Sequence, residues 1–284
     1  MTALDDSIVY LNGEFVPLNE AKISVMDRGF LFGDGVYEVI PVYGGRPLRL
    51  DEHMTRLENS LRGIRMEPPL STGEWAAVFS RLIQGGHDQS IYLQVTRGVA
   101  PKRDHAIPTE IEPTLFAMCT PIAPLPIEGI KAITVDDIRW QWCHIKAITL
   151  LANVLLRQAA VDRGCTESIL IRDASAVEGA ASNLFVLVDG VLITPPKSNE
   201  LLPGITRDLV LEIALQHGIA VQERKITLSE LKAAPEVWLT SSTREIMPVI
   251  ELDGAQVGEG VPGPLWQRMQ ALYQDYKEIL RRPS

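Results

Sequence analysis

Residues 135–154 read VDDIRWQWCHIKAITLLANV and contain the side chain on which the interpretation of the whole chain depends. We expect a strand over 131–142, followed by a long apolar helix that begins at Ile145. Lys146 is the only cation inside that apolar run. Burial lowers the pKa of a lysine and exposes a neutral amine, which is a nucleophile toward aldehydes. Lys146 is therefore a candidate catalytic residue, although a lysine that extends from a helix edge into solvent would give the same pattern.

Composition limits the classes of function. The chain has 284 residues, of which 46% are hydrophobic, so it can form one large domain or two ordinary ones. The net charge is −9 and no basic run occurs, which argues against nucleic acid and anionic membrane as partners. Three widely spaced cysteines predict reduced thiols and no metal site. With no signal peptide and no apolar run of membrane-spanning length, we expect a cytoplasmic protein.

The order of predicted elements indicates an α+β chain in two parts. Alternating strands and two helices, one of them capped by Asp51, come before a proline-rich segment with the sequence PIAPLPIE. We predict a small N-terminal α/β domain over 1–120, an interdomain linker over 121–128, and a larger C-terminal domain over 129–284 that carries Lys146.

Three further stretches hold polar groups suited to a phosphorylated ring. Glu178, in AVEGAASNLF, fits either a partner of a protonated ring nitrogen or a polar turn residue. In LPGITRD, Gly204 precedes a helix start, so the N–H groups of Ile205 and Thr206 can bind an anion; an ordinary Thr206 cap is the alternative. The hydroxyls of TSST, residues 240–243, suit a phosphate or a solvated turn.

Together, the order and spelling of seven motifs identify a family. The motifs are FGDGVYEVI, HMTRLENS, VTRG, RWQWCHIKAITLLANV, VEGAASNLF, LPGITRD and TSSTREIMPVIELDG. This set, which spans roughly residues 8–256, resembles the fold-type IV pyridoxal-phosphate enzymes and most of all their D-amino-acid aminotransferases. The resemblance implies a two-domain fold with pyridoxal 5'-phosphate between the domains, and a homodimer. It also implies ping-pong transfer of the amino group of D-amino acids, such as D-alanine or D-glutamate, to a 2-oxo acid.

The resemblance also implies a role for each matched position. Lys146 matches the lysine that bonds to the cofactor and moves the substrate proton, and Glu178 matches the acid that keeps the ring nitrogen protonated. The remaining cofactor contacts are Arg56, Ile205, Thr206 and Ser242 at the phosphate, and Leu202 at the pyridine ring. The substrate α-carboxylate is matched by Tyr37, Arg103 and His105. For the last two, a solvated charged loop is the alternative.

Some positions depart from the family pattern. Lys102 is an extra residue before the Arg-x-His pair, and Ala180 and Ala181 replace serines that D-specific relatives often have. Arg244 is unexpected in its turn; it either alters the pocket or recognises an acidic side chain such as that of D-glutamate. Leu151 stands where branched-chain L-aminotransferases usually have a tyrosine, which counts against that activity.

Three other functions remain open from the sequence. A branched-chain L-amino-acid aminotransferase and, more distantly, an aminodeoxychorismate lyase use the same scaffold. A non-enzymatic module that binds some phosphorylated ligand through the glycine-rich turns and hydroxyls belongs to a different class.

Overall fold

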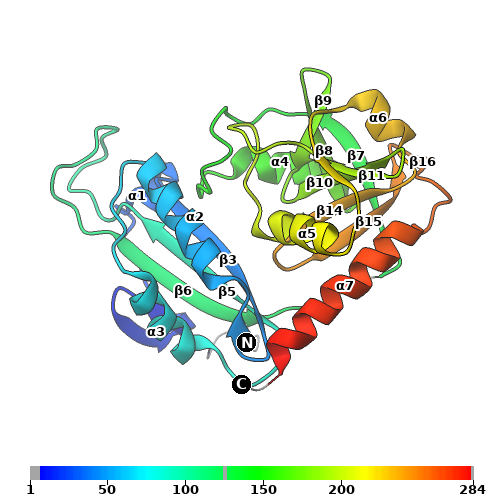
Figure 1. Ribbon diagram of the computed structural model, residues 1–284. Coiled ribbons are helices and arrows are strands. Elements are labelled where there is room, and N and C mark those ends of the chain that lie inside the picture. The colour runs from blue at the N-terminus through cyan, green and yellow to red at the C-terminus, as the bar shows by residue number, and fades with distance from the viewer. Residues whose placement is uncertain (1–6, 124–126, 283–284) are drawn as a thin grey trace. The chain divides into compact units, whose positions relative to one another are not determined.

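The computed structural model describes residues 7–123 and 127–282 (Figure 1). The chain forms two compact units. The first unit comprises Met1–Ala123, Ile145–Thr149 and Leu280–Ser284, and the second comprises Pro124–His144 and Leu150–Ile279. Both units combine helices with a sheet, so the predicted α+β class is confirmed.

The first unit is built on a six-stranded antiparallel sheet in the order β2-β1-β6-β5-β3-β4. The strands are β1 (Ile8–Leu11), β2 (Glu14–Pro17), β3 (Gly35–Tyr43), β4 (Arg46–Pro47), β5 (Gln89–Thr96) and β6 (Thr114–Pro121). The tight turn between β1 and β2 uses Asn12 and Gly13, both with positive φ, as the Asn-Gly pair predicts.

Three α-helices and one 3-10 helix accompany this sheet: η1 (Leu18–Glu20), α1 (Arg28–Phe32), α2 (Leu50–Gly63) and α3 (Thr72–Leu82). Helix α2 lies along β3 (Figure 1). Leu57 and Leu61 of α2 and Phe79 of α3 pack into the core with residues of β3 and β5. The predicted cap of α2 is wrong, because Arg49, with φ 50°, is the N-cap and Asp51 lies in the first turn. An acidic residue there still stabilises the helix end.

The second unit contains a mixed ten-stranded sheet. Its order is β12-β11-β10-β14-β15-β7-β8-β9-β13, and β16 pairs with β15. The strands are β7 (Ile130–Asp136), β8 (Glu167–Arg172), β9 (Ser175–Gly179), β10 (Asn183–Val188), β11 (Val191–Thr194), β12 (Val221–Glu223), β13 (Ile226–Thr227), β14 (Val237–Ser241), β15 (Glu245–Leu252) and β16 (Ala255–Gln256). The helices are α4 (Leu151–Val161), α5 (Ile205–Gln216), α6 (Leu228–Ala233) and α7 (Pro264–Arg281). Helix α4 connects the parallel strands β7 and β8, the usual arrangement for a parallel pair.

The predicted long helix from Ile145 is wrong in its first turn. Helix α4 begins at Leu151, and residues 143–150 before it form turns, bends and one isolated β-bridge. Cys143, Ile145 and Ala147 are buried while the residues between them are less so, which is a period of two. Ala147 forms a β-bridge with Val36. Because this segment bonds to β3, residues Ile145–Thr149, including Lys146, belong to the first unit.

Two further predictions differ in detail from the structure. The strand expected over 131–142 ends at Asp136. Glu178 lies within β9, a strand that the sequence did not predict. The proposed linker over 121–128 includes residues 124–126, which lie outside the described residues. Within the described ranges, 7–123 and 127–282, no helix is both long enough and apolar enough to cross a membrane.

Candidate active site

The backbone of Lys146 is fixed on both sides by hydrogen bonds within the first unit. Its carbonyl accepts from the Tyr37 N–H at 3.0 Å, and its own N–H donates to Ser60 Oγ at 3.1 Å. The side chain is partly buried, and Nζ lies 4.2 Å from the centre of the Tyr37 ring. An ammonium over an aromatic face is attracted by the ring quadrupole. The structure therefore brings together two predicted site residues, Lys146 and Tyr37, and does not leave the lysine extended into solvent.

A buried ion cluster holds Arg56, a predicted phosphate contact. Glu38 of β3 is fully buried and accepts two hydrogen bonds from Arg56, both 2.7 Å long. One of the same two oxygens, Oε2, also lies 2.8 Å from His53 Nδ1. Burial opposes the charge on Glu38, but the Arg56 guanidinium outweighs it and lowers the pKa of the carboxyl. Burial also lowers the pKa of His53, so the imidazole is neutral at pH 7.

This cluster places Arg56 in the same neighbourhood as Lys146, since the charges of both residues lower the pKa of His53. The sequence analysis missed Glu38 and His53 as site residues. Both lie within motifs that it used, YEV and HMTR, and the signal was a charged residue inside an otherwise apolar strand.

The loop between β5 and β6 carries Arg103 and His105, and both side chains are exposed. They lie together at the ring of Phe32. The Arg103 guanidinium carbon is 5.2 Å from the centre of that ring, and the His105 ring centre is also 5.2 Å away. Tyr37, the third residue of the predicted carboxylate trap, faces Lys146 and Tyr92 instead. The structure thus brings together two of the three trap residues.

Arg28 at the start of α1 holds this loop and was missed by the sequence analysis. Its guanidinium donates to the carbonyls of Asp104, at 2.6 Å, Ala106, at 3.2 Å, and His105, at 3.4 Å. Asp34 neutralises Arg28 at 2.7 Å. The extra residue of the loop, Lys102, forms only an exposed pair with Asp104.

Arg97 holds Asp34, the carboxylate that pairs with Arg28. Its side chain donates to both carboxylate oxygens of Asp34, at 2.8 and 3.0 Å, and to the carbonyl of Ile64 at 2.6 Å. Arg28 and Arg97 are both at least 95% buried, so one carboxylate holds two cations that are shielded from water.

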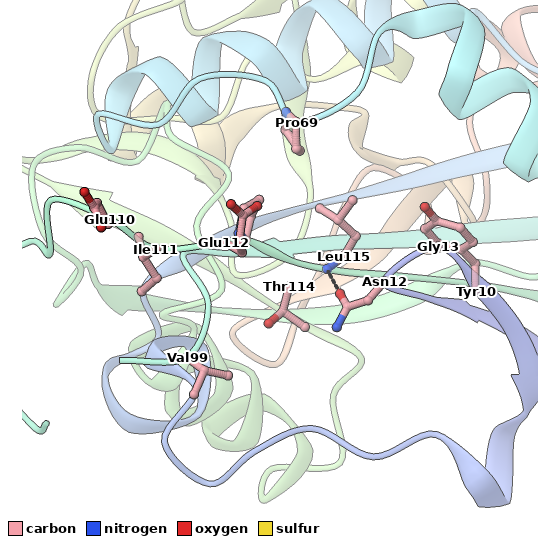
Figure 2. Close-up of a pocket in the computed structure, with 11 residues that line it drawn as sticks. Tyr10, Asn12, Gly13, Pro69, Val99, Glu110, Ile111, Glu112, Thr114 and Leu115 are labelled. Carbon is pink, nitrogen blue, oxygen red and sulfur yellow. Dashed lines mark hydrogen bonds between the residues drawn. The ribbon is translucent and has the colours of Figure 1, made fainter. Parts of the chain in front are cut away.

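The first unit also has a hollow that none of the predicted site residues line. Figure 2 shows it between the β1–β2 turn and the chain leading into β6. Asn12 Oδ1 accepts a hydrogen bond from the Leu115 N–H there at 2.8 Å. Its lining includes two carboxylates, Glu110 and Glu112, so it does not suit an anionic ligand.

The second unit surrounds Glu178 with donors. Glu178 is 3% exposed, and its carboxylate accepts from Arg139 at 2.5 Å, from the Leu202 N–H at 3.1 and 3.2 Å, and from Asn183 Nδ2 at 3.1 Å. Arg139 is held in turn by a two-point pair with Asp137. Burial raises the pKa of Glu178 to about 7, although its Arg139 and Leu202 bonds favour the charged form. A polar turn residue would be exposed, so this alternative does not describe Glu178.

The N-terminus of α5 lies next to this carboxylate. Its N-cap is Gly204, and no side chain caps the helix, so the alternative of a Thr206 cap is not found. Uncapped N–H groups and the helix dipole favour an anion at this end. Gly204 is required there, since a Cβ would lie 1.9 Å from Asn183 Oδ1. Asn183 also donates to the Leu202 carbonyl at 2.8 Å.

The turn that carries Ser242 lies at the same end of the sheet. Strand β14, which precedes this turn, pairs with β10 so that Thr240 faces Asn183. The Thr240 hydroxyl is buried and has no hydrogen-bond partner among the described residues. The predicted cofactor residues of the second unit are therefore linked to Glu178 and Asn183: Leu202 through hydrogen bonds, Ile205 and Thr206 through the helix start at Gly204, and Ser242 through the turn that follows Thr240.

These groups fit a phosphorylated aromatic ring with a basic nitrogen. The helix N-terminus and the hydroxyl-rich turn suit a phosphate, and a buried acid whose charged form is supported by Arg139, Asn183 and the Leu202 N–H suits a ring nitrogen that must carry a proton. Among the described residues, no three His, Cys, Asp or Glu side chains form a set that could hold a metal ion.

The family model for Amino-transferase class IV matches residues 35–252. This span covers every site residue that the sequence analysis predicted, from Tyr37 to Ser242. The chain belongs to the class IV aminotransferase family, as the resemblance to fold-type IV enzymes predicted.

Particular relatives narrow the comparison. The D-alanine aminotransferase of Bacillus licheniformis is 40% identical over 272 residues, covering 94% of this chain and 96% of the relative. That of Staphylococcus haemolyticus is also 40% identical, covering 95% and 98%. Among solved structures, the branched-chain aminotransferase of Escherichia coli has a TM-score of 0.85 at 29% identity, covering 95% of this chain and 93% of that chain. The T.th. branched-chain amino acid aminotransferase with pyridoxamine 5'-phosphate has a TM-score of 0.89 at 28% identity, covering 99% and 96%.

Proposed function

We propose that this protein is a pyridoxal-phosphate-dependent transaminase that moves the amino group of D-amino acids, such as D-alanine or D-glutamate, to a 2-oxo acid by a ping-pong mechanism. The observation that carries the proposal is the 40% identity, over nearly the full length, to D-alanine aminotransferases. When bound, the cofactor supplies an electron-withdrawing ring that stabilises negative charge at the substrate Cα.

Lys146 is the proposed covalent attachment point and the base that removes the proton from the substrate Cα. A neutral amine is needed for both tasks. The backbone bonds to Tyr37 and Ser60 fix the position of the residue, and the partly buried side chain places Nζ against the Tyr37 ring. The same amine then gives this proton up again, so Lys146 acts first as a base and then as an acid.

Glu178 is the proposed partner of the ring nitrogen. Its carboxylate is already desolvated and oriented by Arg139, Asn183 and Leu202, so it does not need to reorganise when the reaction begins. A negative charge beside the ring nitrogen raises the nitrogen pKa and keeps it protonated.

The other predicted site residues either hold the cofactor or bind the substrate. The proposed phosphate contacts are Arg56, Ile205, Thr206 and Ser242, and Leu202 packs against the ring. Arg103 and His105 bind the substrate α-carboxylate, with Tyr37 as the third member. The shared position of Arg103 and His105 on the Phe32 ring supports this pair, because a rigid platform reduces the entropy lost on binding.

A homodimer in the cytoplasm is the proposed assembly and location. The exposed face of α4 supports self-association, since Leu151, Val154 and Leu155 are 71%, 59% and 54% exposed. Adjacent apolar side chains of this size on a surface mark an interaction site. The cytoplasmic location rests on the sequence, in which three widely spaced cysteines are typical of reduced thiols.

A substrate panel tests the proposed function. The holoenzyme is mixed with D-alanine, D-glutamate or L-leucine in the presence of 2-oxoglutarate, and the new amino and oxo acids are separated by chiral chromatography. We expect both D-amino acids to react and L-leucine to react at least roughly 100-fold more slowly. Exclusive use of L-leucine would refute the proposal.

The second candidate is branched-chain L-amino-acid transamination, which the close structural match to branched-chain aminotransferases favours. The identity to those proteins is lower, at 28–29%, than to the D-alanine enzymes. Lyase activity on aminodeoxychorismate would appear instead as pyruvate release with no amino acceptor present.

A further inference from the structure

Two arginines and one carboxylate in the second unit have no role in the chemistry described above. Glu167 at the start of β8 is fully buried. Arg157 of α4 and Arg244 of the turn between β14 and β15 each place Nη1 3.6 Å from the same oxygen, Glu167 Oε2. The Arg157 and Arg244 side chains are 30% and 36% exposed, whereas Glu167 is fully buried.

The hydrogen bonding of this cluster is incomplete. A separation of 3.6 Å is too long for a hydrogen bond, and Arg157 Nη1 is a buried nitrogen without a hydrogen-bond partner among the described residues. The carboxylate is partly occupied by other donors, with Oε1 accepting from the Ser168 N–H at 3.1 Å and Oε2 from Ser182 Oγ at 3.5 Å. Two cations therefore share one anion, and guanidinium N–H groups are left to bind another.

The pKa of Arg244 also indicates that the cluster has too little negative charge for its two guanidinium groups. Burial, followed by the charge of Arg157, lowers the pKa of Arg244. A second carboxylate between the guanidinium groups would relieve this repulsion and supply the missing acceptors.

The cluster adjoins the proposed cofactor residues of the same unit. Arg244 is two residues from Ser242 in one turn. Gly179, the residue that directly follows Glu178, packs against the cluster. A Cβ at Gly179 would lie 2.1 Å from Ser182 Oγ and 3.4 Å from Glu167 Cγ. The cationic cluster therefore adjoins two of the proposed cofactor residues of this unit, Glu178 and Ser242, which makes it a candidate neighbour for the side chain of a substrate bound to the cofactor.

We propose that Arg244, positioned by Glu167 and Arg157, binds the distal carboxylate of a dicarboxylic D-amino acid and of the matching 2-oxo acid. This inference rests on the proposed function. It is separate from the α-carboxylate site, which uses residues of the first unit. The planar guanidinium matches a carboxylate with two parallel hydrogen bonds, which an uncharged side chain such as that of D-alanine cannot form.

The test compares kcat/KM for D-glutamate and D-alanine in Arg244→Met. We expect the ratio of D-glutamate to D-alanine to fall roughly 30- to 100-fold, since the variant loses a charge-assisted pair of hydrogen bonds. Arg244→Lys keeps the charge without the fork and recovers part of the ratio. The matched control is Arg163→Met, which removes the same charge from an exposed position beyond α4 and leaves the ratio unchanged.

A binding measurement separates recognition from folding. The holoenzyme is titrated with glutarate, which has two carboxylates, and with butyrate, which has one. Arg244→Met should weaken glutarate roughly 30-fold and change butyrate much less. If Arg244→Met loses equal affinity for glutarate and butyrate, the inference is overturned. It is also overturned if the ratio of kcat/KM for D-glutamate to that for D-alanine is unchanged. Either result leaves the proposed function intact. If the unmodified enzyme turns over no D-amino acid at all, the proposed function fails, and the inference fails with it.

Discussion

Glu178 sits on a strand, almost fully buried, with four donor contacts to its carboxylate. A carboxylate in this setting is maintained only if it has a charged partner, because burying an acid without one costs several kcal/mol. Arg139 is that partner within the chain, and a protonated ring nitrogen is the second one that the proposed function supplies.

Replacement of Glu178 tests this role. In Glu178→Gln the side chain keeps its shape but cannot hold the ring nitrogen protonated. We expect the single-turnover rate of the holoenzyme with D-alanine to fall roughly 100- to 1,000-fold. The control is Glu212→Gln on the exposed side of α5, which makes the same chemical change and should leave the single-turnover rate unchanged. A Glu178→Gln enzyme as fast as the unmodified one would exclude a role in the reaction.

Glu38 gives the pH dependence of stability a definite sign. Its pKa in the folded protein is below the ordinary value of 4.5, so its stabilising contribution is complete above about pH 4.5 and is lost as the pH falls further. Glu38→Gln should lower the free energy of unfolding by about 3 kcal/mol at pH 7, because Arg56 loses its buried partner.

The check is denaturant unfolding of both proteins at pH 7 and pH 4. The difference between them should narrow at the lower pH, where the unfolded state of the unmodified protein gains a proton. A difference that stays constant, or that widens at pH 4, would contradict the assignment of a lowered pKa to Glu38.

At the scale of elements, α1 and the loop after β5 act together. Arg28 of α1 donates to three successive carbonyls of the loop, at Asp104, His105 and Ala106. A charged donor to a carbonyl contributes more than a neutral one, and three of them fix the direction in which the loop side chains point. The proposed α-carboxylate site therefore depends on a residue that does not touch substrate.

Arg28→Met should raise KM for D-amino acids roughly 10-fold while changing kcat less, since the loop loses its support and the chemistry does not. The control is Lys102→Met in the same loop, whose pair with Asp104 is exposed and contributes little. Equal losses in KM and kcat, or a KM no different from the control, would show that Arg28 does not position the site.

The sequence predicted the presence of most helices and strands better than the residues at which they begin and end. A strong local signal, the Asn12-Gly13 turn, appears in the structure where expected. The apolar run at Ile145 was read as helix because its period of two is short and is followed directly by a true helix. Hydrogen bonds to β3 decide the outcome there, and a single sequence does not show such a partner.

The candidate site was predictable to the extent that a motif spelled it out. Lys146 and Glu178 lie in motifs that resemble the family; Lys146 is found partly buried with its backbone fixed by hydrogen bonds, and Glu178 almost fully buried. Arg28 and Glu167 act through partners distant in sequence, so local spacing held no signal for them. Their roles follow from distances that only the fold creates.

At the scale of the whole molecule, the proposed assembly determines which chain completes each site. If the loop with Arg103 enters the site of the partner in a homodimer, two inactive variants can repair each other. Arg103→Met lacks the carboxylate ligand and Lys146→Ala lacks the amine. A mixed dimer has one site with neither defect and one with both.

Equal amounts of the two variants, unfolded and refolded together, should therefore recover about a quarter of the activity of the unmodified enzyme, because half of the dimers are mixed and each has one intact site. Each variant refolded alone is the control. No recovery, together with a dimer confirmed by sedimentation, would mean that the loop serves its own chain.

Covalent attachment at Lys146 tests the central claim most directly. The holoenzyme is treated with borohydride, digested and analysed by mass spectrometry, in parallel with Lys146→Ala. We predict a phosphopyridoxyl group on the peptide containing Lys146, absent from the variant, and a turnover of D-alanine that falls at least roughly 1,000-fold in Lys146→Ala. A reduced adduct on another lysine, or a variant with full turnover, would contradict the account.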